Sequence, residues 1–266
     1  TRPVGGGASE EIRMLSGYER STFRHAIADG RPVEHDVYTK GDGPVVVLLQ
    51  ELPGISAETL ALADRLCGDG FRVVMPHLFG PLGKFSLAGN LARVMCMRRE
   101  FHLFSRNASS PIVDWLRALC RQVRAQYEVS GVGVIGMCLT GNFAISLMAD
   151  ESVLASVASQ PSLPLLGTNH LHMSSEDVAA ARARLTERGP MLALRFEKDI
   201  ACTAGKFEAL EATFNRDQER ITTRTLPGRG HSVLTVHFVD SQGSPTAAAL
   251  REVLDYFHSK LDVIRS

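Results

Sequence analysis

The chain has 266 residues, of which 44% are hydrophobic and 22% charged, close to the average of globular proteins and sufficient for one sizeable core. Its 29 Lys and Arg residues balance its 29 Asp and Glu residues, so no net charge draws it to nucleic acid or to an anionic membrane. This composition excludes a collagen, a coiled coil and a disordered chain, and we expect neither nucleic acid nor a membrane as a partner.

The cysteines and the N-terminal residues indicate the compartment. No stretch approaches the roughly 18 consecutive apolar residues that a membrane-spanning helix needs. The first residues, TRPVGGGASEE, lack the apolar core of a signal peptide. The five cysteines are odd in number and form no C-x-x-C pair, unlike a disulfide framework or a clustered zinc site. We therefore expect a cytoplasmic protein with free thiols and no metal.

The first 32 residues are Gly-rich at the start and only weakly periodic. We interpret residues 1–32 as an N-terminal arm, with a short amphipathic segment around residues 12–28. Residues 33–266 are expected to form one domain, because apolar runs and amphipathic segments alternate from there onward.

Short apolar runs rich in β-branched residues predict strands, and segments with helical periodicity predict helices between them. The strands are expected at 45–50, 71–75, 132–136, 153–159, 191–196 and 221–226. The helices are expected at 57–67, 112–127, 139–149, 175–187, 204–214 and 245–260. This alternation predicts an α/β fold with a mostly parallel sheet and helices on both faces, whose ligands bind at the carboxyl ends of the strands.

The segment 77–111 interrupts this alternation and is longer than most connections in compact domains. It carries basic side chains among apolar residues, namely Arg93, Arg98, Arg99, His102 and Arg106. We interpret it as a lid-like insertion with a basic face, and an ordinary solvated helix fits the same pattern.

The strongest local signal is the sequence GMCLTG at residues 136–141, between a predicted strand and a predicted helix. A nucleophile at this point, here Cys138, sits on a tight turn that small flanking residues make room for. The N–H groups and the dipole of the following helix favour a thiolate and help to hold an oxyanion. The alternative is a buried core cysteine, which the strand-turn-helix context makes less favourable.

A cysteine nucleophile needs a base and a residue that orients the base. In the α/β-hydrolase arrangement an acid and then a histidine follow the nucleophile in the chain, each after a later strand. Asp199 follows the strand 191–196, and His231 follows the strand 221–226 in a Gly-rich turn. Each alone would be an ordinary loop residue, but the order Cys138, Asp199, His231 predicts a triad.

Glu51 directly follows the predicted strand 45–50, in the loop that supplies the second oxyanion donor in hydrolases of this fold. We expect the backbone N–H groups of Leu52 and Leu139 to form the oxyanion hole. The Glu51 carboxylate can accept the thiol proton or hold the resting thiol. The alternative is a surface turn residue.

These motifs resemble the dienelactone hydrolase family, a branch of the α/β hydrolases that uses cysteine where its relatives use serine. The resemblance covers about residues 33–260 and rests on the E-x-x-G loop from Glu51, the G-x-C-x-x-G elbow, Asp199 and the G-x-G-H-S turn. It implies hydrolysis of a small-molecule ester or lactone without metal or organic cofactor. It also implies that Cys138 is the nucleophile, His231 the base, Asp199 its orienting residue and Glu51 a partner of the resting thiol.

The chain departs from the family pattern in two places. Thr140 stands two residues after Cys138, where the family usually has glycine. Residues 233–235 read Val-Leu-Thr and contain no arginine, although members that act on dienelactone hold its carboxylate with one there. Arg93 or Arg98 of the insertion would be a substitute. We therefore expect either dienelactone or a more apolar ester or lactone as the substrate.

Two other functions fit the same sequence. One is a non-catalytic binding protein that kept the hydrolase fold, and the other is a thioesterase or acyl transferase with the same triad.

His170 and His172 have no third metal ligand nearby and are interpreted as surface residues. Residues 95–97 (Met-Cys-Met) are interpreted as packing residues, and Cys202 as buried.

Overall fold

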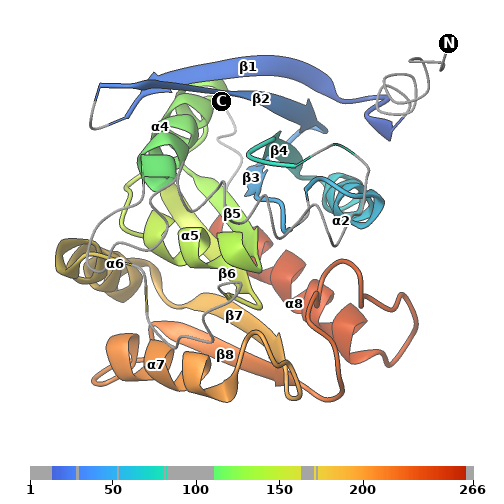
Figure 1. Ribbon diagram of the computed structural model, residues 1–266, viewed down its shortest axis with the longest axis vertical. Helices are drawn as coiled ribbons and strands as arrows, with labels where there is room; N and C mark the ends of the chain where they lie inside the picture. The colour runs from blue at the N-terminus through green and yellow to red at the C-terminus, as the bar shows by residue number, and fades with distance from the viewer. Residues whose placement is uncertain are drawn as a thin grey trace, which may run out of the picture.

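The computed structural model describes residues 14–27, 30–52, 54–80, 82, 111–162, 171 and 173–261. A single central sheet runs through these residues, with helices on both sides (Figure 1). The strands are β1 (Glu19–Ala26), β2 (Pro32–Lys40), β3 (Val45–Leu48), β4 (Arg72–Pro76), β5 (Val132–Met137), β6 (Val153–Ser159), β7 (Met191–Phe196) and β8 (Ile221–Leu226). The helices are α2 (Ala57–Gly68), α4 (Pro111–Gln126), α5 (Leu139–Leu147), α6 (Ser175–Arg188), α7 (Ala204–Phe214) and α8 (Pro245–Lys260).

The strands lie in the order β1-β2-β4-β3-β5-β6-β7-β8. The pairs β1·β2 and β2·β4 are antiparallel, and all other neighbouring pairs are parallel. The predicted α/β fold with a mostly parallel sheet is thereby confirmed. Because β3 and β5 to β8 run the same way, the loops after these strands meet along one edge of the sheet.

Alternate residues of each central strand enter two separate apolar cores. In β3, Val45 and Val47 face the core shared with helices α4 to α7, whereas Val46 and Leu48 face the core shared with α2 and α8. All four side chains are fully buried. Burial on both faces explains why the sequence shows continuous apolar runs here instead of alternation.

The strands and helices predicted beyond residue 43 are found within a few residues of their expected bounds. The sequence did not predict β1 and β2, and β1 lies in the segment expected to be an N-terminal arm. Only Phe23 of β1 is buried, so the strand lacks the alternating apolar pattern that would have identified it. Phe23 packs on Trp115 of α4 with ring centroids 5.1 Å apart, and the Trp115 indole donates to the carbonyl of Val33 at 3.0 Å.

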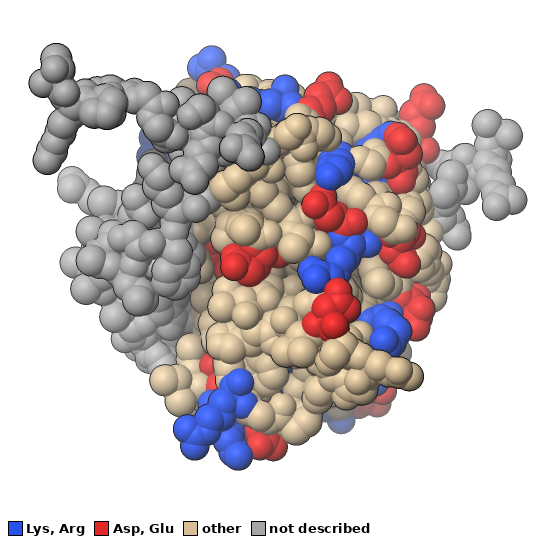
Figure 2. Space-filling model, turned by 90° about the vertical axis from the view of Figure 1, so that its right-hand side faces the viewer, with Lys and Arg blue, Asp and Glu red and all other residues tan. Residues whose placement is uncertain are grey.

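Several predictions concern residues outside those that the structure describes. They are Arg93, Arg98, Arg99, His102 and Arg106 of the expected insertion, together with residues 95–97, His170 and His172. Among the described helices, none is both long and apolar enough to cross a membrane. On the face of the molecule in Figure 2, Lys and Arg side chains are interspersed with Asp and Glu, in keeping with the zero net charge.

Candidate active site

Cys138 lies at the end of β5, directly before the first residue of α5. Its backbone has φ 55° and ψ −120°, an unfavourable conformation for a residue with a Cβ atom. The N–H of Cys138 donates to the carbonyl of Ser159 at 3.1 Å, which holds the turn against the end of β6. The strained turn presents the half-buried thiol at the carboxyl edge of the sheet, as the elbow motif predicts.

Two glycines permit this close turn by lacking a side chain. A Cβ atom at Gly136 would lie 2.2 Å from the carbonyl oxygen of Thr140, and one at Gly141 would lie 2.9 Å from the Cα of Pro161. Both distances are far too short for carbon atoms, so neither position accepts alanine without a shift of the backbone. The small residues of the motif are therefore needed for the approach of strand and helix.

Thr140, the residue that departs from the family pattern, is completely buried. Its hydroxyl accepts the N–H of Met137 at 2.9 Å and lies 3.0 Å from the carbonyl oxygen of Gln50. The side chain thus connects the turn after β5 to the end of β3. Threonine is larger than the glycine usual in the family, and its hydroxyl is accommodated by these backbone hydrogen-bond partners.

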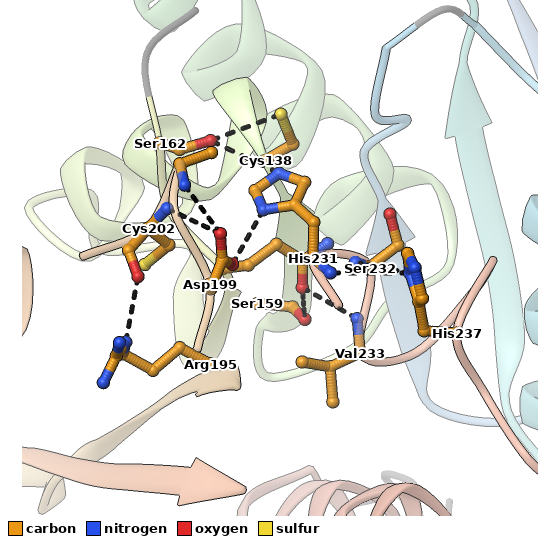
Figure 3. A network of polar contacts seen from close by, with 12 residues as sticks. Cys138, Ser159, Ser162, Arg195, Asp199, Cys202, His231, Ser232, Val233 and His237 are labelled. Carbon is orange, nitrogen blue, oxygen red and sulfur yellow. Dashed lines mark hydrogen bonds and ion pairs between the residues drawn. The ribbon is translucent and has the colours of Figure 1, made fainter. Parts of the chain in front are cut away.

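His231 and Asp199 come from the loops after β8 and β7 and lie beside the elbow (Figure 3). The Nδ1–H of His231 donates to Oδ2 of Asp199 at 2.8 Å. The other carboxylate oxygen accepts the N–H groups of Ala201 and Cys202 at 2.8 and 2.9 Å. These bonds fix the carboxylate, which in turn fixes the ring and leaves Nε2 directed toward the elbow.

The electrostatics of this pair favour a charged imidazole. Burial disfavours the charged form of His231 and lowers its pKa. The hydrogen bond to Asp199 and the neighbouring Cys138 have a larger opposite effect, so that the pKa of His231 rises from 6.5 to about 10. Burial also opposes ionisation of Asp199, yet its hydrogen bonds to His231 and to backbone N–H groups lower its pKa. A carboxylate and an imidazolium therefore stabilise each other beside the thiol.

Ser162 is part of the same network, although the sequence analysis did not identify it. Its hydroxyl oxygen lies 3.4 Å from Sγ of Cys138 and 3.4 Å from Nε2 of His231 (Figure 3). No motif surrounds this serine, and only the pairing of β5 with β6 brings it to the elbow. Its position shortly after β6, the strand that pairs with β5, is the feature that points to it.

Glu51 is buried in a second polar cluster on the other side of the His231 loop. Its Oε2 accepts the Ser232 hydroxyl at 2.7 Å and the amide of Gln160 at 3.3 Å, and its Oε1 accepts the hydroxyl of Thr235. Burial raises the pKa of Glu51, and the hydrogen bonds from Thr235 and Ser232 partly offset this effect. The carboxylate is occupied by these partners, and its role toward the resting thiol stays a prediction.

The comparison with known protein families decides the affiliation of the chain. The sequence model of the dienelactone hydrolase family matches residues 35–261, which is most of the chain. The chain belongs to the dienelactone hydrolase family. Members of this family are hydrolases.

Solved structures of hydrolases have the same fold as this family member. A candidate dienelactone hydrolase from Klebsiella pneumoniae subsp. pneumoniae is 15% identical, with a TM-score of 0.62 over 90% of this chain and 99% of that one. A dienelactone hydrolase-like promiscuous phosphotriesterase from metagenomic libraries is 18% identical, with a TM-score of 0.64 over 91% and 99%. A Pyrococcus furiosus esterase is 13% identical, with a TM-score of 0.57 over 98% of each chain.

These identities are low, so the structural likeness establishes the α/β-hydrolase fold, which confirms the predicted fold class. Among curated proteins, none matches the chain significantly.

The positions expected to form the oxyanion hole lie in the elbow itself and in the loop after β3. Leu139 is the first residue of α5, where a backbone N–H has no acceptor within its helix. Leu52 is half-buried in the loop after β3 and packs against the core. Their pairing as oxyanion donors stays a prediction.

The region after His231 differs from that of a family member with a carboxylate-binding arginine. Val233 and Leu234 are completely buried in the core beneath α8, and Thr235 is bonded to Glu51.

The buried Arg195 donates to the carbonyls of Cys202 and Glu197, so it supports the loop that carries Asp199. Within the described residues, no three His, Cys, Asp or Glu side chains gather as metal ligands would.

Proposed function

We propose that this member of the dienelactone hydrolase family cleaves an ester or lactone bond of a small molecule through the triad Cys138, His231 and Asp199. The observation that carries the proposal is the strained elbow that presents the thiol beside a histidine held by a buried carboxylate. A binding protein on this fold would need neither the strain nor the ordered pair, since both are features of catalytic nucleophiles.

The proposed reaction has two steps. The Cys138 thiolate attacks the carbonyl carbon, and the N–H groups of Leu52 and Leu139 stabilise the oxyanion. The tetrahedral intermediate collapses as His231, protonated at Nε2, gives its proton to the leaving alkoxide. His231 then takes a proton from water, whose hydroxide attacks the thioester. The Cys138 thiolate leaves, the acid is released, and the proton kept by His231 restores the ion pair. Asp199 holds the ring in the required tautomer, and the steps need neither a metal nor an organic cofactor.

The surroundings of the triad favour an apolar substrate. Val233 and Leu234 replace the segment in which an arginine would hold a substrate carboxylate. Ile200, next to Asp199, is 93% exposed, and Val236, in the His231 loop, is 52% exposed. Exposed large apolar side chains on the loops that carry Asp199 and His231 support binding of an uncharged acyl or alcohol portion.

The test is the rate of iodoacetamide alkylation at each cysteine, read by mass spectrometry, with turnover of p-nitrophenyl acetate and a small panel of lactones and thioesters alongside. We expect Cys138 to react fastest, because burial raises the pKa values of Cys67, Cys120 and Cys202. Cys138→Ala should lower turnover by about a thousandfold or more while the protein stays folded.

Cys67→Ala is the matched control, because Cys67 is the other half-buried cysteine among the described residues and lies at the end of α2, where its thiol contacts the carbonyl of Lys40. Its turnover should equal that of the wild type. Retained turnover in Cys138→Ala would overturn Cys138 as the nucleophile. An unreactive Cys138 with no ester, lactone or thioester cleaved would move the assignment to a binding protein.

A further inference from the structure

Ser162 is fixed in place by its own backbone. It follows β6 by three residues, and its N–H donates to the carbonyl of Cys138 at 3.1 Å. The side-chain amide of Asn142 donates to the carbonyl of Ser162 at 3.1 Å. Only 4% of Ser162 is exposed. These contacts need only the main chain of Ser162, so the hydroxyl is free for other partners.

The hydroxyl contacts both of the groups that must exchange a proton. Its oxygen is at the same distance, 3.4 Å, from the sulfur of Cys138 and from Nε2 of His231. Because Nδ1 of His231 donates to Asp199, Nε2 is the nitrogen that gains and loses a proton. A hydroxyl has one hydrogen and two lone pairs, so it can accept from one neighbour while it donates to the other.

We propose that Ser162 is a further catalytic residue, which relays a proton between the thiol of Cys138 and the imidazole of His231. In the neutral pair, the S–H donates to the Ser162 oxygen and the Ser162 O–H donates to Nε2. When both hydrogens move, the S–H bond and the serine O–H bond break, and a new serine O–H bond and an Nε2–H bond form. The serine is regenerated, and a thiolate and an imidazolium result.

The relay has a second consequence for the charged pair. After the transfer, Nε2–H donates to the Ser162 oxygen and the serine O–H donates to the thiolate. Hydrogen bonds to charged groups are stronger than those between neutral groups. The hydroxyl therefore stabilises the thiolate and imidazolium relative to the thiol and imidazole.

This inference rests on the proposed function, because it assumes that the thiolate of Cys138 is the reacting species. The experiment is the pH dependence of iodoacetamide alkylation at Cys138 in the wild type, Ser162→Ala and Ser162→Thr. Ser156→Ala is the matched control, since Ser156 of β6 is a fully buried serine whose hydroxyl donates to the carbonyl of Ala144. Thermal unfolding checks that each variant is folded.

We expect Ser162→Ala to slow the alkylation of Cys138 at pH 7 by about tenfold and to move the pH profile upward by about one unit. Ser162→Thr, which keeps the hydroxyl, should stay within about threefold of the wild type, and Ser156→Ala should not differ from it. A loss of packing alone would lower stability without moving the pH profile.

Wild-type rates in Ser162→Ala would overturn the relay and show that the thiol gives its proton to His231 directly. Equal slowing in Ser162→Ala and Ser162→Thr would overturn it as well, because the hydroxyl would then not be the feature that matters. The proposed function fails in a different way, namely through ester cleavage that survives Cys138→Ala. That result would remove the thiolate from the reaction and the relay with it.

Discussion

Two polar clusters meet at the loop after β8, where neighbouring residues point to opposite sides. His231 belongs to the thiol network, which consists of Cys138, Ser162, His231 and Asp199. Ser232 belongs to the carboxylate cluster, which consists of Glu51, Gln160, Ser232 and Thr235. The His231 side chain is 26% exposed, whereas Glu51 is 3% exposed.

The difference in exposure between His231 and Glu51 indicates that the two clusters have different roles. A reacting group must be reached by substrate and water, whereas a group that only positions others is best shielded from competing water. Gln160 is fully buried with φ 37°, and its side-chain oxygen accepts the N–H of Val233 at 3.2 Å. The carboxylate cluster therefore joins the loops after β3, β6 and β8, and it holds His231 in place from behind.

The largest effect should come from breaking the thiol network at its base. His231→Ala should lower kcat/KM for the best ester by about a thousandfold or more, because neither the proton transfer nor the ion pair is then available. His258→Ala is the matched control, since His258 pairs with Asp69 on the surface. Steady-state kinetics measure the effect, and activity of His231→Ala near the wild-type level would contradict the triad.

Breaking the carboxylate cluster should affect stability first. Glu51→Ala should lower the free energy of unfolding by about 3 kcal/mol, because the buried hydroxyls of Ser232 and Thr235 and the amide of Gln160 lose their acceptor. Urea denaturation measures the loss. Glu51→Gln keeps the shape and removes a buried charge, so we expect it to cost less than about 1 kcal/mol.

The same pair of Glu51 variants tests the role implied by the family resemblance. If Glu51 holds the resting thiol, Glu51→Gln should change the alkylation rate of Cys138. An unchanged rate would leave Glu51 as a positioning residue of the His231 loop only.

A smaller effect is expected from the contact between the elbow and the end of β3. Thr140→Val keeps the shape of the side chain but leaves the N–H of Met137 without its acceptor, and it should lower the free energy of unfolding by about 2 kcal/mol. Thr140→Ser keeps the hydroxyl and serves as the control. Equal stability of Thr140→Val and the wild type in urea would show that the hydrogen bonds of this threonine contribute nothing.

The smallest effect should be a dependence of stability on pH. Because the pKa of His231 is raised from 6.5 to about 10 in the folded protein, protonation of the ring favours the folded state. This stabilisation is complete below about pH 6.5 and is lost as the pH rises through 10. Between these values, the free energy of unfolding should fall by at least about 1 kcal/mol more in the wild type than in His231→Ala. Parallel urea denaturation curves at the two pH values would contradict the raised pKa.

Much of the fold and of the thiol network was readable from local sequence. The predicted strands β3 and β5 are continuous runs of buried residues because they are covered on both faces, and Cys138 directly follows β5. Asp199 and His231 lie in the loops after β7 and β8. The strands β1 and β2 were not predicted. Only Phe23 of β1 is buried, and this strand lies within residues 1–32, which were expected to form an arm. An antiparallel edge strand exposed on most of its length carries little apolar signal.

The sequence by itself determined the α/β class, the order of the central strands and helices along the chain, the turn at Cys138, and the placement of Asp199 and His231 in loops after later strands. These features depend on backbone turns and on the burial of neighbouring residues, which a local pattern records. Only the tertiary structure decided that the Ser162 hydroxyl contacts both the thiol and His231, and that Glu51 bonds to Ser232, Thr235 and Gln160. Those contacts arise because β6 lies beside β5 and because the loops after distant strands converge at one sheet edge, and strand order is a property of the packed sheet as a whole.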